Sequence, residues 1–109
     1  MKKILILTLF IAFSAQASTI NPTKIVKILA GPNYGNLVFL YIDPKPATVP
    51  ACQTNDKWSY VFDGSTDAGK IYLSIALSAY AANKDVWLDG DDSCILYQNV
   101  EDLGYIVSQ

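Results

Sequence analysis

Residues 66–83 read Thr-Asp-Ala-Gly-Lys-Ile-Tyr-Leu-Ser-Ile-Ala-Leu-Ser-Ala-Tyr-Ala-Ala-Asn, a helical pattern that interrupts a series of strand-like segments. Thr66 suits the N-cap position, Asp67 places an acidic residue in the first turn, and Asn83 suits the C-terminal exit. The residues between them are good helix formers apart from Gly69. The sequence therefore predicts a helix over residues 68–82.

This helix is apolar around most of its circumference. Three polar residues at intervals of four form one narrow stripe along it: Lys70, Ser74 and Ser78. Apolar residues on the two sides of this stripe form the expected contact face for other chains: Ile71, Ile75, Leu73, Leu77 and Tyr80. A helix on a small sheet needs only about a 100° apolar arc, so the wider arc predicts contacts outside the domain. The alternative explanation is that Ala and Tyr side chains tolerate partial exposure.

Strand-like segments lie on both sides of the helix. The expected strands are residues 23–30, 37–42, 58–62, 85–88 and 95–107. Turn formers at 31–36 join the first two strands into a hairpin, and three prolines make 43–50 a loop or an edge. A turn is expected at 89–92, and the last strand is expected to break near Asp102 or Gly104.

The order of these elements predicts the fold. Three strands, a helix and two strands follow one another, which is the order of a five-stranded OB-type Greek-key barrel with the helix between strands 3 and 4. The expected fold class is therefore mainly β with one helix.

The N-terminus has the pattern of an export signal. Lys2 and Lys3 form a basic region, residues 4–13 are apolar except for one Thr, and Ala15-Gln16-Ala17 is a small-x-small cleavage motif. We expect residues 1–17 to be a signal peptide and 18–109 to be the domain, secreted or periplasmic after cleavage near Ala17. The apolar run is shorter than the roughly 20 residues of a membrane-spanning helix, so no membrane span is expected.

Charge and composition exclude several functions. Two of the eight basic residues are Lys2 and Lys3, so the expected mature chain has six Lys against ten acidic residues, a formal charge of −4. Nucleic acid is a poor partner for that balance. The chain has no His and no Arg, which excludes Ser-His-Asp and Cys-His nucleophile pairs. We expect no catalytic residues. The remaining enzyme hypothesis is a small hydrolase that uses carboxylates among Asp63, Asp67, Asp89 and Glu101.

Cys52 and Cys94 are the only two cysteines. An exported protein reaches a compartment where a disulfide persists, and closing a loop of about 43 residues would stabilise the fold by roughly 4 kcal/mol. A redox pair or a metal site would need Cys-x-x-Cys spacing or further ligands. An EF-hand loop starting at Asp89 would need Glu at position 100, where Val100 stands. We therefore expect a structural disulfide, no metal and no cofactor.

Aromatic residues provide the strongest indication of binding. Tyr and Trp present flat apolar faces with a polar tip, which suits sugar rings and protein interfaces. The turn that carries Tyr34 is expected at the surface, where functional residues concentrate. The expected ligand-binding residues are Asn33, Tyr34, Asn36 and Trp58. The alternatives are that Tyr34 closes the end of the barrel and that Trp58 belongs to the core, where we also expect Trp87.

Residues 51–88 resemble the B subunit of subtilase cytotoxin and the small exported proteins similar to it. The matching features are Ala51-Cys52, an aromatic segment ending at Phe62, the helix with Tyr72-Leu73 and Ser78-Ala79-Tyr80, and Asp85-Val86-Trp87-Leu88 followed by a second Cys. The resemblance implies an OB-fold protomer that assembles as a ring pentamer with its helix at the centre. It also implies binding of cell-surface glycans through the barrel and docking of an enzymatic A subunit.

The glycan site of that family uses a serine near the first strand. This chain has Asn21-Pro22-Thr23-Lys24 in the corresponding region, so the resemblance implies no particular sugar. The leading hypothesis is an exported, non-catalytic binding module that self-associates and recognises a glycan or a protein partner. A monomeric periplasmic domain that binds or inhibits another protein is the alternative.

Overall fold

The computed structural model describes residues 17–109, and most of the expected signal peptide, residues 1–16, lies outside the described residues. The elements follow one another as β1 (Thr19–Ala30), the 3-10 helix η1 (Pro32–Tyr34), β2 (Leu37–Asp43), β3 (Tyr60–Asp63), α1 (Asp67–Ala81), β4 (Val86–Gly90) and β5 (Leu103–Ser108). The prediction of a mainly β fold with one α-helix is confirmed. All these elements lie within residues 18–109.

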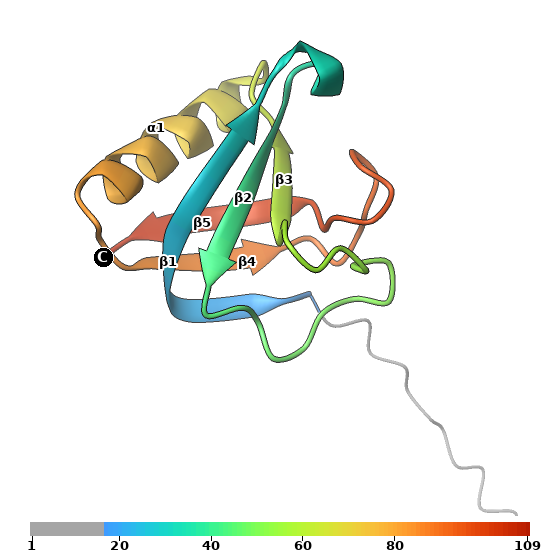
Figure 1. The fold of residues 1–109 in the computed structure, drawn as a ribbon, viewed down its shortest axis with the longest axis horizontal. Helices are drawn as coiled ribbons and strands as arrows, with labels where there is room; N and C mark the ends of the chain where they lie inside the picture. Colours follow the sequence, from blue (N-terminus) through green and yellow to red (C-terminus); the bar gives the residue numbers. More distant parts are fainter. Residues whose placement is uncertain (1–16) are drawn as a thin grey trace, which may run out of the picture.

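The five strands form one sheet in the order β3-β2-β1-β4-β5, and each neighbouring pair is antiparallel. β1 pairs with β4 through residues 19–23 and with β2 through residues 24–30. Its register shifts between Ile20 and Thr23 and again between Ile25 and Lys27, and Figure 1 shows β1 curving from the β4–β5 layer toward β2 and β3. A single bent strand therefore joins the two layers.

The two outer strands of this sheet approach each other as well. Val61 of β3 forms a parallel bridge with Asp102, just before β5, and the Val61 amide donates to the Glu101 carbonyl at 3.0 Å. This contact brings the open edges of the sheet together, so the sheet curls around a single interior.

That interior is filled by alternate side chains of the strands. Its members from the strands are Ile25, Val38, Leu40, Ile42, Tyr60, Phe62, Val86, Leu88, Leu103 and Ile106. Ala76 and Ala79 of α1 are buried against the same core, and Leu73 and Ile75 pack beside them half-buried. Alternation with period two places the core residues of β2, β3 and β4 on one face. In β5, Leu103 and Ile106 are three positions apart, and the register shift between Asp89 and Gly90 brings both to that face.

α1 begins and ends close to its predicted bounds. The Thr66 hydroxyl accepts the Gly69 amide at 2.9 Å, so Thr66 is the N-cap, as predicted. The helix then passes close to the end of β3. A Cβ atom at Gly69 would lie 1.7 Å from the Asp63 carbonyl oxygen, so only glycine allows this approach.

The predicted disulfide is confirmed. Cys52 and Cys94 are bonded with their Cα atoms 6.1 Å apart, across a sequence separation of 42 residues. The bond ties the loop that follows β2 to the loop that precedes β5. These two loops cover a second apolar cluster, separate from the first and centred on Phe39, Val61 and Val100.

Two predicted strands near the N-terminal half have different bounds. β1 begins at Thr19 rather than residue 23, because residues 19–23 find their partners in β4. β3 spans Tyr60–Asp63 rather than 58–62, because the pairing with β2 runs from Tyr60 to Asp63.

The C-terminal predictions need larger corrections. Residues 89 and 90, expected in a turn, continue β4, since Asp89 pairs with Tyr105 and Gly90 with Leu103. The expected strand over 95–107 is wrong before Leu103. There the Asp102 carboxylate accepts the amides of Ile95 and Leu96, each at 3.0 Å, and holds the chain in a loop.

Gly69→Ala should lower the free energy of unfolding by about 2 kcal/mol, because the added methyl group collides with a backbone carbonyl and must displace the helix. Urea denaturation measures the change. Gly31→Ala is the control, since Gly31 has an extended φ of 172° and no atom within 4 Å of a new Cβ. Equal losses at the two positions would contradict the close helix approach.

Candidate functional site

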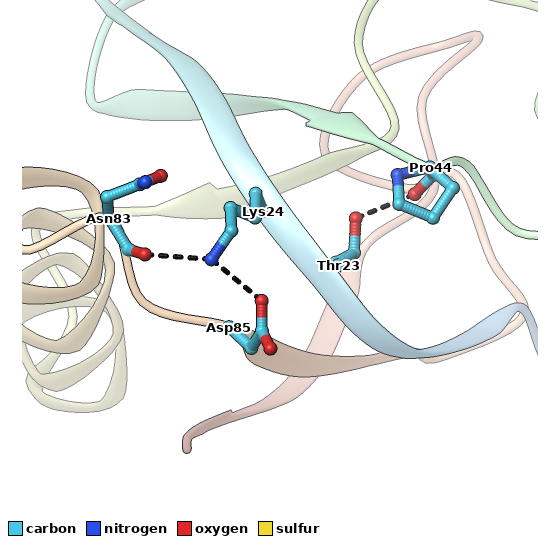
Figure 2. Close-up of polar contacts among 5 residues, drawn as sticks. All are labelled: Thr23, Lys24, Pro44, Asn83 and Asp85. Carbon is cyan, nitrogen blue, oxygen red and sulfur yellow. Dashed lines mark hydrogen bonds and ion pairs between the residues drawn. The ribbon is translucent and has the colours of Figure 1, made fainter.

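A groove of about 890 Å³ opens between the first half of β1, the end of β2 and the chain that follows α1. We name it the β1 groove and define it by the residues that shape it: Thr23, Lys24, Val26, Pro44, Tyr80, Asn83 and Asp85. Figure 2 shows five of them with the polar contacts that join them. Three segments that are distant in sequence meet here because β1 crosses between the two layers.

Lys24 makes the polar contacts on one side of the groove. Its ammonium lies 2.8 Å from the Asp85 carboxylate and donates to the Asn83 carbonyl, also at 2.8 Å (Figure 2). Asn83 has a positive φ of 52° just after the end of α1, where a carbonyl at the helix C-terminus favours a cation. Both members of the ion pair remain about half exposed, so they contribute little to stability and keep access to solvent.

Thr23 makes the polar contact on the other side of the groove. Its side chain is buried, and its hydroxyl donates to the Pro44 carbonyl at 2.7 Å (Figure 2). This bond fixes the start of the proline-rich loop against β1. The polar groups of the groove are therefore positioned by two contacts that β1 makes with different partners.

An apolar wall completes the groove. Tyr80, on the last turn of α1, is 50% exposed, and Val26 on β1 is 41% exposed. A flat aromatic face beside fixed charged and hydrogen-bonding groups is the combination that small-molecule and sugar sites use. Sequence reasoning had assigned Tyr80 to the helix contact face and had not connected it with Lys24 or Asp85.

The four residues predicted to bind ligand lie elsewhere, three in the connection between β1 and β2 and Trp58 just before β3. Tyr34 packs edge-on against Phe39 at 5.2 Å between ring centroids, and Trp58 packs against the same ring at 6.2 Å. The structure thus brings Tyr34 and Trp58 together around Phe39, with Tyr34 still partly exposed. Asn33 and Asn36 are exposed in the adjoining turn. Ligand binding by this set stays a prediction.

Sequence reasoning missed the ring that organises this cluster. Phe39 is fully buried, and Tyr97 from the disulfide-bonded loop packs against it at 4.9 Å. The signal was present in β2, where Phe39 alternates with core residues and therefore points outward. Its cover comes from a loop nearly sixty residues later in the chain, which the local pattern does not reveal.

The predicted helix contact residues fall into two groups. Ile71, Leu77 and Tyr80 are exposed, with exposed fractions of 60%, 48% and 50%. Leu73 and Ile75 are half-buried and pack against the core. At 100° per residue, Ile71 lies on one flank of the buried stripe, and Leu77 and Tyr80 lie on the other.

The carboxylates considered for hydrolysis do not gather in one cleft. Asp63 and Asp67 stand at the start of α1, Asp89 lies on β4, and Glu101 is completely buried. Glu101 accepts the amides of Ser18 at 3.2 Å and Asp92 at 2.9 Å, and the Ser18 hydroxyl donates to it too. Burial raises the pKa of Glu101. A carboxyl enclosed in this way has no route to a substrate.

A smaller hollow of about 340 Å³ near the start of α1 brings Asp63 together with two further acidic residues, Asp91 and Asp102. Burial raises the pKa of Asp91, with Asp102 and Asp89 adding to the effect. The Asp102 carboxylate, however, already accepts two loop amides and the Ser93 hydroxyl at 2.8 Å. The Asp102 carboxylate therefore stabilises the conformation of this loop. Across residues 17–109, no cluster of three potential metal ligands occurs.

No protein-family model, curated protein or solved structure matches this chain. Within the described part of the chain, none of the helices has the length and apolar character needed to cross a membrane.

Thr23→Val should lower the free energy of unfolding by about 1 kcal/mol, because it removes the donor to the Pro44 carbonyl from a buried position. Lys24→Met should cost less, because its ion pair is half exposed. Urea denaturation of both variants tests the ranking. The reverse order would mean that Lys24, and not Thr23, holds the groove together.

Proposed function

We propose that this chain is an exported, non-catalytic binding module of OB type that self-associates and holds a glycan in the β1 groove. The sheet order supports the OB assignment, because β1 pairs with both β2 and β4, and the segment before β5 runs parallel to β3. A five-stranded Greek-key barrel closes in this way, with its helix between the third and fourth strands.

Export is supported by two independent features. The first 17 residues have the charge and apolar pattern of a signal peptide. The Cys52–Cys94 disulfide is typical of proteins that fold in an oxidising compartment. The product is secreted or periplasmic.

The observation that carries the glycan assignment is the exposed Tyr80 ring in the same groove as the Lys24–Asp85 pair. An aromatic face stacks on the apolar face of a sugar ring, while the ammonium and the carboxylate bond its hydroxyl groups. The groove also lies along residues 22–26, where this chain lacks the serine used by the family it resembles, so the assignment rests on the groove's own residues.

Self-association is supported by the two exposed apolar flanks of α1. Ile71 lies on one flank and Leu77 on the other, so the helix of one protomer can use a different flank toward each neighbour. An interface between two different patches is heterologous, and heterologous interfaces close into rings when the rotation permits. A ring pentamer with α1 at its centre fits this arrangement. An enzymatic A subunit would then dock on the ring.

Tyr80→Ala should weaken glycan binding at least about tenfold, because it removes the stacking face from the groove. A glycan array identifies the ligand, and calorimetric titration with that soluble glycan then measures the affinity free of multivalency. Tyr105→Ala, which removes an exposed tyrosine of β5 outside both candidate sites, is the matched control and should leave the affinity unchanged, whereas Tyr34→Ala tests the set predicted at the β1–β2 turn. Loss on Tyr34→Ala alone would move the site to the β1–β2 turn, and no bound glycan on the array would contradict the assignment.

Ile71→Asp and Leu77→Asp should each break the ring, and a mixture of the two variants should form a dimer of one copy of each. Each variant retains one intact flank, so a heterologous interface permits a single contact between them. The mass in solution at micromolar concentration gives the oligomeric state of the parent chain, of each variant and of the mixture. Ser74→Asp, on the polar stripe, is the control of equal charge. A monomeric parent chain would remove the ring and favour the monomeric protein-binding domain.

A further inference from the structure

Among the residues that the structure describes, no cation pairs with the buried Glu101 carboxylate. It is held at the end of the barrel by the amides of Ser18 and Asp92 and by the Ser18 hydroxyl, which also bonds the Tyr60 hydroxyl at 2.8 Å. Among residues 17–109, the ion pair that forms is Lys24–Asp85, on another side of the molecule. A buried carboxylate without a cation is costly, and burial together with the nearby Asp92 raises its pKa.

The surroundings are nevertheless shaped for this side chain. A Cβ atom at Gly90 would lie 2.1 Å from the Glu101 carboxyl carbon, so the glycine makes room for it. The Tyr60 hydroxyl donates to the Ser18 carbonyl at 3.1 Å and holds Ser18 in place. The Ser18 nitrogen lies 3.2 Å from Oε2 of Glu101. This nitrogen belongs to the peptide bond where the signal peptide is expected to end.

We propose that cleavage of the Ala17–Ser18 bond supplies the missing cation, and that the new α-ammonium of Ser18 forms a buried ion pair with Glu101. The inference rests on the proposed export of the chain. A signal peptidase hydrolyses the bond with one water molecule. The hydroxyl of that water goes to the Ala17 carbonyl carbon, which becomes a carboxylate. The Ser18 nitrogen takes up the protons and becomes an ammonium group.

The geometry specifies this one bond. A cut before Ala17 would leave the Ser18 nitrogen as an uncharged amide, and a cut after Ser18 would remove both of its contacts with Glu101. Ser18 is buried in the folded domain, so a protease must act before folding is complete. Cleavage during export meets that requirement.

The ion pair has a defined pH dependence. Glu101 raises the pKa of the Ser18 α-amine above the ordinary value of about 8, so the added stability is complete below about pH 8 and is lost as the pH rises through the raised value. In return, the ammonium lowers the pKa of Glu101 relative to the uncleaved chain. The other titratable groups facing the pair are Tyr60, Asp92 and Asp89, and none of them supplies a cation.

The test compares a chain beginning at Ser18 with one beginning at Ala17. Residues 18–109 contain every strand, α1, both apolar clusters and the disulfide, so the shorter chain retains the whole fold. At pH 7 the folding equilibrium constant from urea denaturation should be about 10- to 100-fold larger for the Ser18 chain. Glu101→Gln should abolish that difference, whereas Ser18→Ala, which retains the ammonium, should preserve it.

Equal folding constants, or a difference that survives Glu101→Gln, would overturn the ion pair. A second measurement does not depend on the folding of the Glu101→Gln variant and follows ¹⁵N-labelled Ser18 by NMR titration. The α-amine of the Ser18 chain should titrate well above pH 8, and an ordinary value would reject the proposal.

Mass spectrometry of the protein recovered from cells that express the full chain identifies its first residue. A mature chain that begins at Ser18 supports the inference. A mature chain that begins elsewhere but still binds the glycan overturns it and leaves the proposed function intact. A mature chain that begins at Ser18 but binds no glycan supports the inference and contradicts the proposed glycan binding.

Discussion

The rest of the structure depends on one strand that must serve two layers. β1 has twelve residues, and its two register shifts let it pair with β4 at its start and with β2 afterwards. A straight strand of that length would continue past one partner and leave backbone groups unpaired. The bend instead curls the sheet, and β3 comes within hydrogen-bonding distance of the segment before β5.

The path of β1 positions both the Ser18–Glu101 contact and the β1 groove. Its first residues bring Ser18 to Glu101, two residues that are 83 positions apart in the chain. A few residues later, Thr23 and Lys24 reach the loop after β2 and the connection after α1. The buried Glu101 carboxylate and the β1 groove are thus neighbours along one strand, and the first half of that strand positions them both.

α1 shows how close packing on one side leaves apolar surface on the others. Gly69, Ala76 and Ala79 are small, so the helix axis approaches the sheet closely along that stripe. The larger residues on the flanks cannot follow it inward. Ile71 and Leu77 therefore remain exposed on opposite sides, which is the physical basis of the proposed contact with two neighbours.

The sequence by itself determined the features that depend on near neighbours or on simple counting. The Thr66 side chain caps the N-terminus of the helix, and the turn after Ala30 connects β1 and β2 into a hairpin. Because the chain has two cysteines, only one disulfide pairing is possible. Tertiary structure alone decided where β1 begins, how far β4 continues and which loop covers Phe39. Strand bounds and buried polar contacts are set by partners from remote parts of the chain, and local periodicity holds no information about those partners.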